Sequence, residues 1–328
     1  MATGELSPTG NGGPDSGPVL SIVVTTYNGK EVLRDCLASI RQNPSREPFE
    51  TIVVDDASTD GTSEMVAAEF PEARLVRNEV NGNYAYANNR GIERARGEFV
   101  LLLNNDTIVL PDSLDAMIAF LRGHPDAGAV GCRLLNEDGS VQWSVKALPA
   151  PAAAIFGARS ILAQRFPNNP FTRKHLLHHD RATSEPLVAG HVSGAASMSP
   201  MAVIRKVGLL DEQFFYHVDA DHCKRIAEAG YKVYYLPTAR IIHLNHKGGS
   251  MANLRKRFRS LMKFETDSYR YYRKHLQTSP WSPMNLVAVV GLSCHFLAIA
   301  TAQTFAELAS MARAAATPAA RRNEPAGS

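Results

Sequence analysis

A short polar sequence, Asn104-Asn105-Asp106-Thr107, directly follows the apolar run from Phe99 to Leu103. A continuous apolar run of this length is typical of a buried strand in a parallel sheet. Such sheets bind ligands at the carboxyl ends of their strands. A carboxylate there can hold a divalent cation against a phosphate, because hard cations take oxygen ligands. The same residues also favour an ordinary turn, so the interpretation depends on the rest of the chain.

A second acidic turn, Asp55 to Thr62 (DDASTDGT), follows the apolar run 51–54. A carboxylate at a strand end can accept hydrogen bonds from a nucleobase or from ribose hydroxyls. Serine, threonine and aspartate in this turn can also cap a helix. Capping alone explains the composition equally well.

An amide-rich segment, Asn78 to Gly91, leads into a helix predicted over 84–96. The amino end of a helix is suited to bind phosphate, and Arg90 could supply a cation to a diphosphate. The alternative is a polar loop followed by an exposed arginine.

Two carboxylates, Asp219 and Asp221, follow an aromatic run at the start of another predicted helix, and either could take a proton from an acceptor hydroxyl. Acidic residues at a helix start are also an ordinary charge preference. Farther along, His243 and His246 precede a glycine-rich turn and could complete a metal site. No third and fourth zinc ligand lies nearby in the sequence, and structural or surface histidines remain the alternative.

The elements that position these residues alternate between strand and helix. Apolar runs predict strands at 19–24, 50–54, 75–76 and 98–103, and helical spacing predicts helices at 30–42, 62–70 and 84–96. The alternation is typical of a parallel sheet covered on both faces. Since all parallel strands point the same way, we expect the following residues to meet in one crevice: Thr25, Tyr27, Asp55, Asp56 and Asp106.

The later elements are less regular. We expect a strand at 126–134, a hairpin over 135–146 with its turn at 137–140, and a strand over 187–201 around Gly194-Ala195. A helix is predicted from Asp219 to Ala229. Two short strands, 231–236 and 239–243, are predicted on either side of Pro237.

Composition restricts the class of protein. The chain has 328 residues, 45% of them hydrophobic, and a net charge of +3, which is no signature of nucleic-acid binding. Its four cysteines are scattered and no signal peptide is visible, which favours a reducing, cytoplasmic setting. Residues 255–274 carry eight basic and two acidic side chains, and the apolar stretch 284–302 follows. This combination indicates an anionic membrane surface on the inner face of the cell membrane; a packed helix and a true span are the alternatives.

The order and spacing of these segments resemble those of family 2 glycosyltransferases, which have the GT-A fold. The resemblance covers roughly residues 19–250. Segments 21–28, 53–62, 78–91 and 104–107 are similar to that family's opening strand, nucleotide-binding turn, amide-rich helix and metal motif. Segments 192–195, 207–212 and 214–215 resemble the acceptor half of its rhamnosyltransferase-like branch.

The resemblance implies an α/β fold, GT-A (Rossmann-like), with a mostly parallel central sheet, helices on both faces and a C-terminal helical extension. It implies a metal-dependent inverting transferase in cell-envelope polysaccharide synthesis. The donor would be a nucleotide-diphospho-sugar such as dTDP-rhamnose, and the acceptor a hydroxyl of a glycan or lipid-linked sugar. The residues implied to bind the nucleotide-sugar are Thr25, Tyr27, Asn28, Asp55, Asp56, Asn81, Asn88, Arg90 and Asn105.

The resemblance also implies the catalytic and metal-binding residues. Asp106 would coordinate Mg²⁺ or Mn²⁺, with His243 or His246 as a further ligand. Asp219 would be the base, with Asp221 as the alternative, since this segment is one residue shorter than the family's; Val218 also stands where the family usually has Glu. Asn104 replaces the first Asp of the Asp-x-Asp metal motif, as it does in many members of the branch.

The sequence bears on two other functions. A non-catalytic nucleotide-sugar or glycan binding protein at the membrane is compatible with Asn104. A dinucleotide-dependent oxidoreductase is disfavoured, because no Gly-x-Gly-x-x-Gly follows the first strand. The expected organisation is a disordered tail at 1–18, a transferase domain at 19–250, a helical extension at 251–312 and a disordered tail at 313–328. The transferase domain would divide into a nucleotide half (19–110) and an acceptor half (111–250).

Overall fold

The computed structural model describes residues 17–142, 144–149, 184–244, 254–277 and 279–316. The chain divides into two compact units. The first contains residues 1–148, 176–212 and 218–245, and the second contains 149–175, 213–217 and 246–328. The sequence did not indicate that 213–217 would group with the second unit. Most of the two predicted tails lies outside the described residues.

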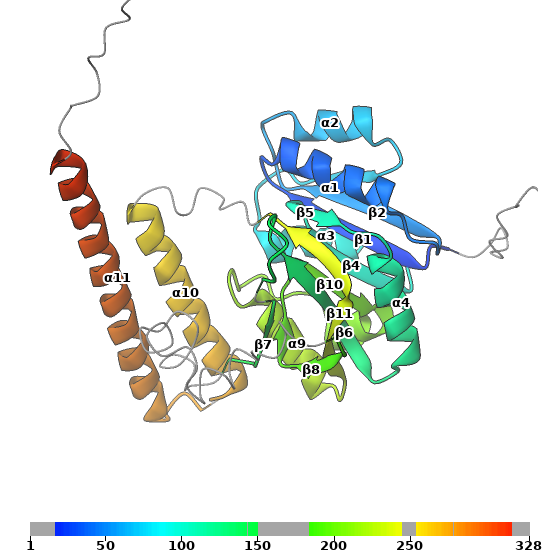
Figure 1. The fold of residues 1–328 in the computed structure, drawn as a ribbon. Coiled ribbons are helices and arrows are strands. Elements are labelled where there is room, and N and C mark those ends of the chain that lie inside the picture. The colour runs from blue at the N-terminus through cyan, green and yellow to red at the C-terminus, as the bar shows by residue number, and fades with distance from the viewer. Residues whose placement is uncertain (1–16, 143, 150–183, 245–253, 278, 317–328) are drawn as a thin grey trace, which may run out of the picture. The chain divides into compact units, whose positions relative to one another are not determined.

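A nine-stranded sheet forms the centre of the first unit (Figure 1). The strand order is β3-β2-β1-β4-β10-β6-β11-β5, with β8 also paired to β11. Strands β3, β2, β1 and β4 are parallel, as are β6 and β11, whereas β10, β5 and β8 pair antiparallel with their neighbours. The strands are β1 (Leu20–Thr26), β2 (Phe49–Asp55), β3 (Arg74–Arg77), β4 (Phe99–Asn104), β5 (Thr107–Val109), β6 (Ala127–Leu135), β8 (Leu187–Ala189), β10 (Ala196–Pro200) and β11 (Lys232–His243). A separate small sheet pairs β7 (Val145–Lys146) with β9 (His191–Val192).

Helices cover both faces of the large sheet because successive strand residues alternate between the faces. In β1, Leu20, Ile22 and Val24 belong to the buried cluster that also contains α1 (Lys30–Gln42), α2 (Thr62–Glu69) and α4 (Ser113–Gly123). The other face packs against α3 (Tyr84–Ile92), α8 (Met201–Val207) and α9 (Val218–Glu228). A Cβ at Gly91 of α3 would lie 2.2 Å from Cγ1 of Val23, so only glycine allows this close approach.

The sequence misplaced several elements. The predicted helix over 84–96 ends at Ile92, because Arg94 and Ala95 donate to Gly91 and Ile92 in tighter i→i−3 bonds. The two strands expected around Pro237 form one strand, β11, whose pairing with β6 breaks between Leu236 and Arg240. Proline has no N–H to donate, and a bulge absorbs it.

The structure also differs from the prediction between β9 and β10 and after β4, whereas one predicted turn is confirmed. Gly194-Ala195, expected inside a strand, links β9 to β10. Neither β5 nor α4 was predicted. The turn at 137–140 is confirmed, with Asn136 N–H donating to Ser140 at 2.8 Å and Gly139 at φ +79°.

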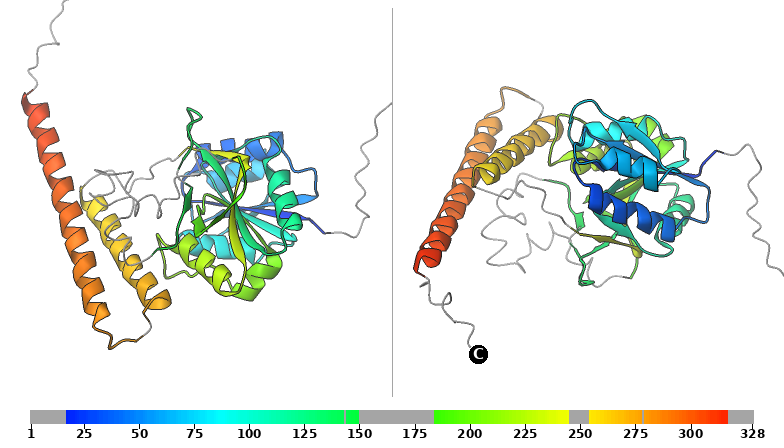
Figure 2. Two further views of the ribbon diagram at one scale, coloured as in Figure 1. Left: turned by 60° about the horizontal axis from the view of Figure 1, so that its bottom comes forward. Right: turned by 90° about the horizontal axis from the view of Figure 1, so that it is seen from above.

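The second unit contains a helical hairpin. Helix α10 (Leu254–His275) and helix α11 (Met284–Ala316) lie side by side (Figures 1 and 2). Arg257 pairs with Glu307 at 3.2 Å and His295 with Glu265 at 2.6 Å, so the two helices run antiparallel. Residues 313–316, expected in the disordered tail, continue α11.

Candidate active site

The carboxyl ends of β1, β2 and β4 meet at one edge of the sheet. Thr26 is in register with Asp55, and Thr25 with Asn104. Asn105 Nδ2 donates to Thr26 Oγ1 at 2.9 Å. The tips of these three strands are therefore adjacent, as parallel pairing requires.

The loop after β1 is fixed by its backbone and by one amide. Asn28 has φ +49°. Its N–H donates to Ser58 Oγ at 2.8 Å, and its Oδ1 accepts from Thr59 N–H at 2.8 Å. A Cβ at Gly29 would lie 2.4 Å from Asn105 Nδ2, so glycine leaves room for that amide. Tyr27 is 52% exposed and presents its ring to solvent.

Asp55 and Asp56 are both buried, at 0% and 4% exposure. Asp55 accepts from Ser58 N–H at 2.9 Å and from the Ser63 hydroxyl at the start of α2. Asp56 accepts from Asn78 Nδ2 at 2.8 Å and from the backbone N–H groups of Gly82 and Asn83. In this structure the two carboxylates hold the neighbouring loops, and their contact with a nucleotide stays a prediction.

The amide-rich segment 78–91 opens α3 as predicted, but Arg90 lies at the other end of that helix. Asn83, at φ +98°, caps α3 by accepting from Tyr86 N–H at 3.1 Å. Asn81 is exposed. Arg90 lies in the last turn of α3 and pairs with Glu93 at 3.2 Å, so its charge is not at the helix amino end where a phosphate was expected.

Asn88 and Asn89 occupy the buried side of α3. Asn88 Nδ2 donates to Tyr84 O at 2.8 Å, and its buried Oδ1 has no hydrogen-bond partner among the described residues. Asn89 was not predicted as a site residue. It accepts from Leu210 N–H at 2.9 Å, and it donates to Leu210 O and Glu212 Oε1, both at 2.9 Å. It thus fixes the 210–212 loop against α3.

Asp106 and His243 form the polar pair at the tips of β4 and β11. Asp106 Oδ1 lies 3.3 Å from His243 Nε2, and both side chains are mostly buried. Thr107 pairs with His243 across β5 and β11, and Leu244 N–H donates to Asp106 O at 2.9 Å, so backbone pairing sets this approach. The β5–β11 pairing, which the sequence did not predict, brings the two residues together.

Gln142 determines which nitrogen of His243 carries the proton. Gln142 Nε2 faces three acceptors: Leu135 O at 3.3 Å, Asn136 Oδ1 at 2.8 Å and His243 O at 2.5 Å. Gln142 Oε1 therefore points at His243 Nδ1, 3.0 Å away, and must accept a proton from it. Nε2 of the neutral ring is left as a lone pair facing the Asp106 carboxylate.

Two acceptors that face each other at 3.3 Å need a positive charge between them. A proton or a metal ion can supply it, and a histidine whose second nitrogen donates to a fixed acceptor is the usual arrangement of a metal ligand. Within the described residues, no group of three or more His, Cys, Asp or Glu side chains could hold a metal ion. Asp106 and His243 would thus supply two ligands and leave the other positions to non-protein oxygens. His246, the second candidate ligand, lies outside the described residues.

Asp219 lies at the amino end of α9 and is partly exposed. Its Oδ2 accepts from Gly194 N–H at 3.3 Å, and Tyr84 donates its hydroxyl to Gly194 O at 2.7 Å. Burial and the nearby Asp219 carboxylate raise the pKa of Tyr84 above its usual value, so Tyr84 stays a neutral donor. Gly194 is thus held between Tyr84 and Asp219.

Asp221 is fully buried and pairs with Arg225 at 2.9 Å. Arg225 in turn donates to the carbonyl groups of Val207, Gly208 and Leu209, which end α8. Of the two carboxylates left open by the sequence, Asp221 therefore holds α9 to α8. The i, i+4 spacing of Asp221 and Arg225 is a signal that could have indicated this pairing.

The neighbouring His222 is also buried. Burial and the adjacent Arg225 lower the pKa of His222 to about 4, and the Asp221 carboxylate only partly offsets them.

One backbone contact connects the two polar groups. Asn104 N–H donates to Ala195 O at 2.9 Å, and Ala195 follows the glycine that contacts Asp219. The 194–195 link thus contacts both Asn104, at the end of β4 two residues before Asp106, and Asp219 of α9. Asn104 itself is half-buried, and its side-chain amide has no hydrogen bond to any described residue.

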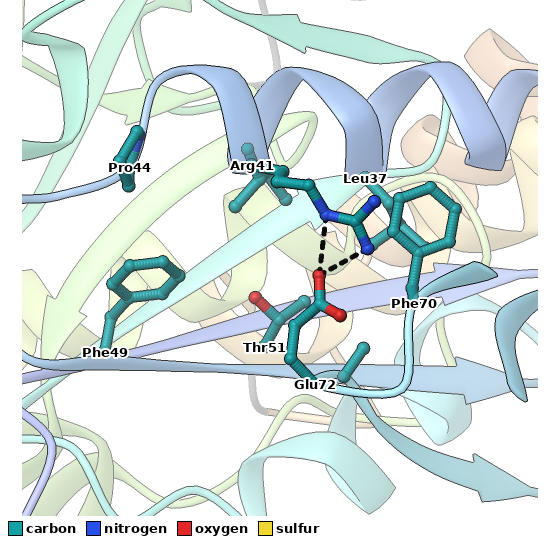
Figure 3. A pocket seen from close by; sticks show the side chains of 9 residues that line it. Leu37, Arg41, Pro44, Phe49, Thr51, Phe70 and Glu72 are labelled. Atoms are coloured by element: carbon teal, nitrogen blue, oxygen red, sulfur yellow. Dashed lines mark hydrogen bonds and ion pairs between the residues drawn. The ribbon is translucent and has the colours of Figure 1, made fainter.

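A separate surface pocket lies at the other end of the strands (Figure 3). Phe49, which lines it, pairs with Leu20 at the start of β1. Arg41 pairs with Glu72 at 2.7 Å across the pocket, and its guanidinium lies 4.4 Å from the Phe70 ring centroid. The Arg41 guanidinium and the Glu72 carboxylate are already paired with each other, and we assign no site there. The lining residues are Leu37, Ile40, Arg41, Pro44, Phe49, Thr51, Phe70, Glu72 and Ala73.

The chain is similar in sequence to known glycosyltransferases. The family model described as "Glycosyl transferase family 2" matches residues 21–204. An N-acetylglucosaminyl-diphospho-decaprenol L-rhamnosyltransferase of Mycobacterium tuberculosis is 30% identical over 244 residues, which are 71% of this chain and 77% of that protein.

Solved structures are similar in fold. A mannosyltransferase of Pyrobaculum calidifontis, in complex with GDP-Man and Mn²⁺, gives a TM-score of 0.54 at 22% identity and covers 93% of this chain and 82% of its own. GalNAc-T7 with UDP, GalNAc and Mn²⁺ also gives 0.54, at 16% identity, over 85% of this chain and 54% of its own. These likenesses confirm the expected GT-A fold.

Proposed function

Because the chain belongs to glycosyl transferase family 2, we propose that it moves a sugar from a nucleotide-diphospho-sugar to an acceptor hydroxyl with inversion at the anomeric carbon. The acceptor is a glycan or a lipid-linked sugar of the cell envelope. The observation that carries the proposal is the Asp106–His243 pair, in which Gln142 fixes the nitrogen lone pair of His243. Asn104, two residues before Asp106, contacts the same 194–195 link that contacts Asp219. A transferase needs these two parts: charge stabilisation at the leaving group and a base at the acceptor.

The residues present fit a divalent cation, Mg²⁺ or Mn²⁺. Asp106 offers a carboxylate oxygen, His243 offers Nε2, and Asn104 has an amide with no hydrogen bond to a described residue. When bound, such a cation offsets the negative charge that develops on the departing diphosphate. The replacement of the first motif aspartate by Asn104 leaves a single protein carboxylate here, which suits a site that phosphate oxygens complete.

Asp219 is the proposed base. It is partly exposed, and the 3.3 Å contact from Gly194 is its only long-range hydrogen bond to a described residue, so an oxygen lone pair is available to a hydroxyl proton. Tyr84 and Gly194 hold it in place from one side. The buried ion pair with Arg225 argues against Asp221 as the base.

For the donor, we propose that Tyr27 stacks on the nucleotide base, while Thr25, Asn28 and Asn105 line the diphosphate side of the β1 tip. Asp55 and Asp56 support this site indirectly, because they fix the loops next to these residues. We retain Asn81 as a candidate contact because it is exposed beside the α3 amino end. Asn88 and Arg90 receive no direct role.

The relative from M. tuberculosis supports a more specific proposal for the donor and the acceptor. Its printed name specifies an L-rhamnosyl donor group and a sugar on a diphospho-polyprenol. By likeness, we propose a dTDP-rhamnose-type donor and a lipid-diphosphate-linked acceptor for this chain. The enzyme would then work on the cytoplasmic side, at the inner face of the cell membrane.

The first experiment measures donor binding. Thermal unfolding is recorded with a panel of nucleotide-diphospho-sugars, with and without Mn²⁺, since a ligand of the native state raises the melting temperature. We expect one donor to stabilise the protein, and only when Mn²⁺ is present. A panel without any Mn²⁺-dependent shift would contradict the proposed donor site.

The second experiment separates an enzyme from a binding protein. We expect donor hydrolysis or transfer with Mn²⁺, loss of it on chelation and recovery on adding the metal back. Donor binding without any turnover, across the acceptors tested, would instead favour the non-catalytic nucleotide-sugar binding protein.

A further inference from the structure

Helix α11 has its polar and apolar sides reversed relative to a helix of a water-soluble protein. Its outward stripe recurs every three or four residues and is largely apolar, with Leu286 at 69%, Leu297 at 62% and Phe305 at 67% exposure. The stripe consists of Leu286, Val290, Cys294, Leu297, Thr301, Phe305 and Leu308, and all of these are exposed. Amphipathic helices on a globular surface bury such a stripe.

The two groups of α11 that form ion pairs lie on its inward side. His295 contacts Glu265 at 2.6 Å and Glu307 contacts Arg257 at 3.2 Å, both on α10. Glu307 is the one Asp, Glu, Lys or Arg in the stretch Met284–Ala309. That stretch is long and apolar enough to cross a membrane, and none of its described side chains is buried.

Helix α10 adds positive charge beside this stripe. Arg255, Lys256, Arg259 and Lys263 are exposed in its first half. Because the helices are antiparallel, this half lies next to the end of α11 that carries Phe305. Trp281, in the connection between the helices, is 92% exposed. Tryptophan and lysine or arginine are the residues that anchor proteins at a membrane interface.

We infer that the α10–α11 hairpin lies flat on an anionic phospholipid bilayer, with the outward stripe of α11 in the boundary between headgroups and acyl chains. Burial of the stripe supplies the apolar contribution, and the basic half of α10 supplies electrostatic attraction to the lipid headgroups.

Spanning is disfavoured by the contacts within the hairpin. The His295–Glu265 pair joins α11 to α10 near the middle of the apolar stretch, and the Glu307–Arg257 pair joins them near its end. To span, α11 would either break these pairs inside hydrocarbon or draw the charged α10 in with it.

A second copy of the chain is disfavoured by charge. Pairing two such stripes face to face would bring two hairpins together whose α10 helices each carry eight basic and only two acidic side chains over 255–274, and like charges repel. An anionic surface instead neutralises them. The inference goes beyond the proposed function, because binding to lipid needs neither a donor nor a cation.

The test is sedimentation of the full chain with vesicles. We expect binding to phosphatidylcholine vesicles that contain about one quarter phosphatidylglycerol, and weak binding to phosphatidylcholine alone. The pair Leu297→Ser and Phe305→Ser, introduced together, should lower the affinity at least about tenfold. Val188→Ser is the matched control, since Val188 is 55% exposed on β8 of the other unit, and it should leave binding unchanged.

A charge variant tests the electrostatic part. Arg259→Glu should weaken binding to the anionic vesicles several-fold and reduce its sensitivity to salt. Arg205→Glu, on an exposed position of α8, makes the same charge change away from the hairpin and should have no effect.

Cys294 allows the depth of the stripe to be measured on the native protein. It is the exposed cysteine, whereas burial raises the pKa of Cys36, Cys132 and Cys223 to about 12 and leaves them unreactive. A polarity-sensitive fluorophore on Cys294 should shift to the blue on anionic vesicles. Lipid nitroxides near the headgroup should quench it more than nitroxides at the bilayer centre.

Three outcomes would overturn the inference. Stronger quenching from the bilayer centre would indicate a span. Absence of vesicle binding, together with a dimer that protects Cys294 from labelling, would indicate a second copy as the occupant. Equal binding by wild type and the Leu297→Ser/Phe305→Ser variant would show that the stripe does not contact lipid. Donor binding by the same samples shows whether the proposed function stands independently of either result.

Discussion

Replacing Gln142 by leucine tests the chain of contacts from Gln142 through His243 to a bound cation. The substitution removes the oxygen that accepts the His243 Nδ1 proton at 3.0 Å. The imidazole can then avoid a buried, unpaired N–H by moving its proton to Nε2, where it would donate to Asp106 3.3 Å away. In that tautomer the nitrogen lone pair no longer faces the position between the two residues.

The magnitude follows from that tautomer change. Metal binding must first restore the proton to Nδ1, where it has no acceptor, and an unsatisfied buried donor costs about 1–3 kcal/mol. We therefore expect Gln142→Leu to weaken Mn²⁺ binding roughly 10- to 100-fold, which is also the usual effect of losing such a supporting residue.

The assay is the dissociation constant of Mn²⁺ from electron paramagnetic resonance of the free ion. Gln42→Leu, at an exposed position of α1, makes the same substitution where no histidine is near and should bind like wild type. His243→Ala should bind more weakly still. The double variant Gln142→Leu/His243→Ala should be no weaker than His243→Ala alone, because Gln142 acts through His243.

Two results would refute the reasoning at different steps. Unchanged Mn²⁺ affinity in Gln142→Leu, with weakened affinity in His243→Ala, would mean that Gln142 does not position the ring. Unchanged affinity in His243→Ala would remove His243 from the metal site altogether.

Three further predictions concern other parts of the site. Asp219→Asn should lower the transfer rate about 10²- to 10⁴-fold while leaving the donor dissociation constant within about twofold of wild type, because a base acts on the acceptor; transfer at the wild-type rate would exclude this base, and Asp138→Asn in the exposed 137–140 turn is the control. Asn89→Ala should lower the free energy of unfolding in urea by about 2–4 kcal/mol, since the Leu210 backbone loses both its partners; a loss below about 0.5 kcal/mol would mean that this loop is held by other contacts. The folded pKa of His222, about 4, lies below the ordinary 6.5, so the unfolded chain takes up this proton first and stability falls as pH drops between these values, by about 2 kcal/mol at about pH 5 relative to about pH 8; urea unfolding of His222→Gln should show a flatter pH dependence, and an unchanged slope would contradict the assignment.

The strand ends and turns of this protein were predictable because their signals are local. Apolar runs followed by polar tips predicted β1, β2 and β4, and parallel pairing then required Thr26, Asp55 and Asn104 to be adjacent. The turn at 137–140 has its glycine at positive φ, as its sequence indicates. The break in β11 at Pro237 was visible too, but the bulge that keeps it one strand depends on the partner β6.

Tertiary structure decided the surroundings of most polar residues. Asp55 and Asp221 are both buried; Asp55 accepts from Ser58 in the turn that follows it, and Asp221 pairs with Arg225 of the same helix. Asn89 and Leu210 are 121 residues apart, and Gln142 and His243 are 101 apart, so no periodicity or spacing could pair them. The free energy of such contacts depends on desolvation and on the orientation of both partners, and only packing of the distant segments sets these. The sequence by itself therefore determined the sheet, its polar edge and the family, while packing determined that Asp219 stays partly exposed, that Asp221 is buried and ion-paired, and which nitrogen of His243 keeps its lone pair.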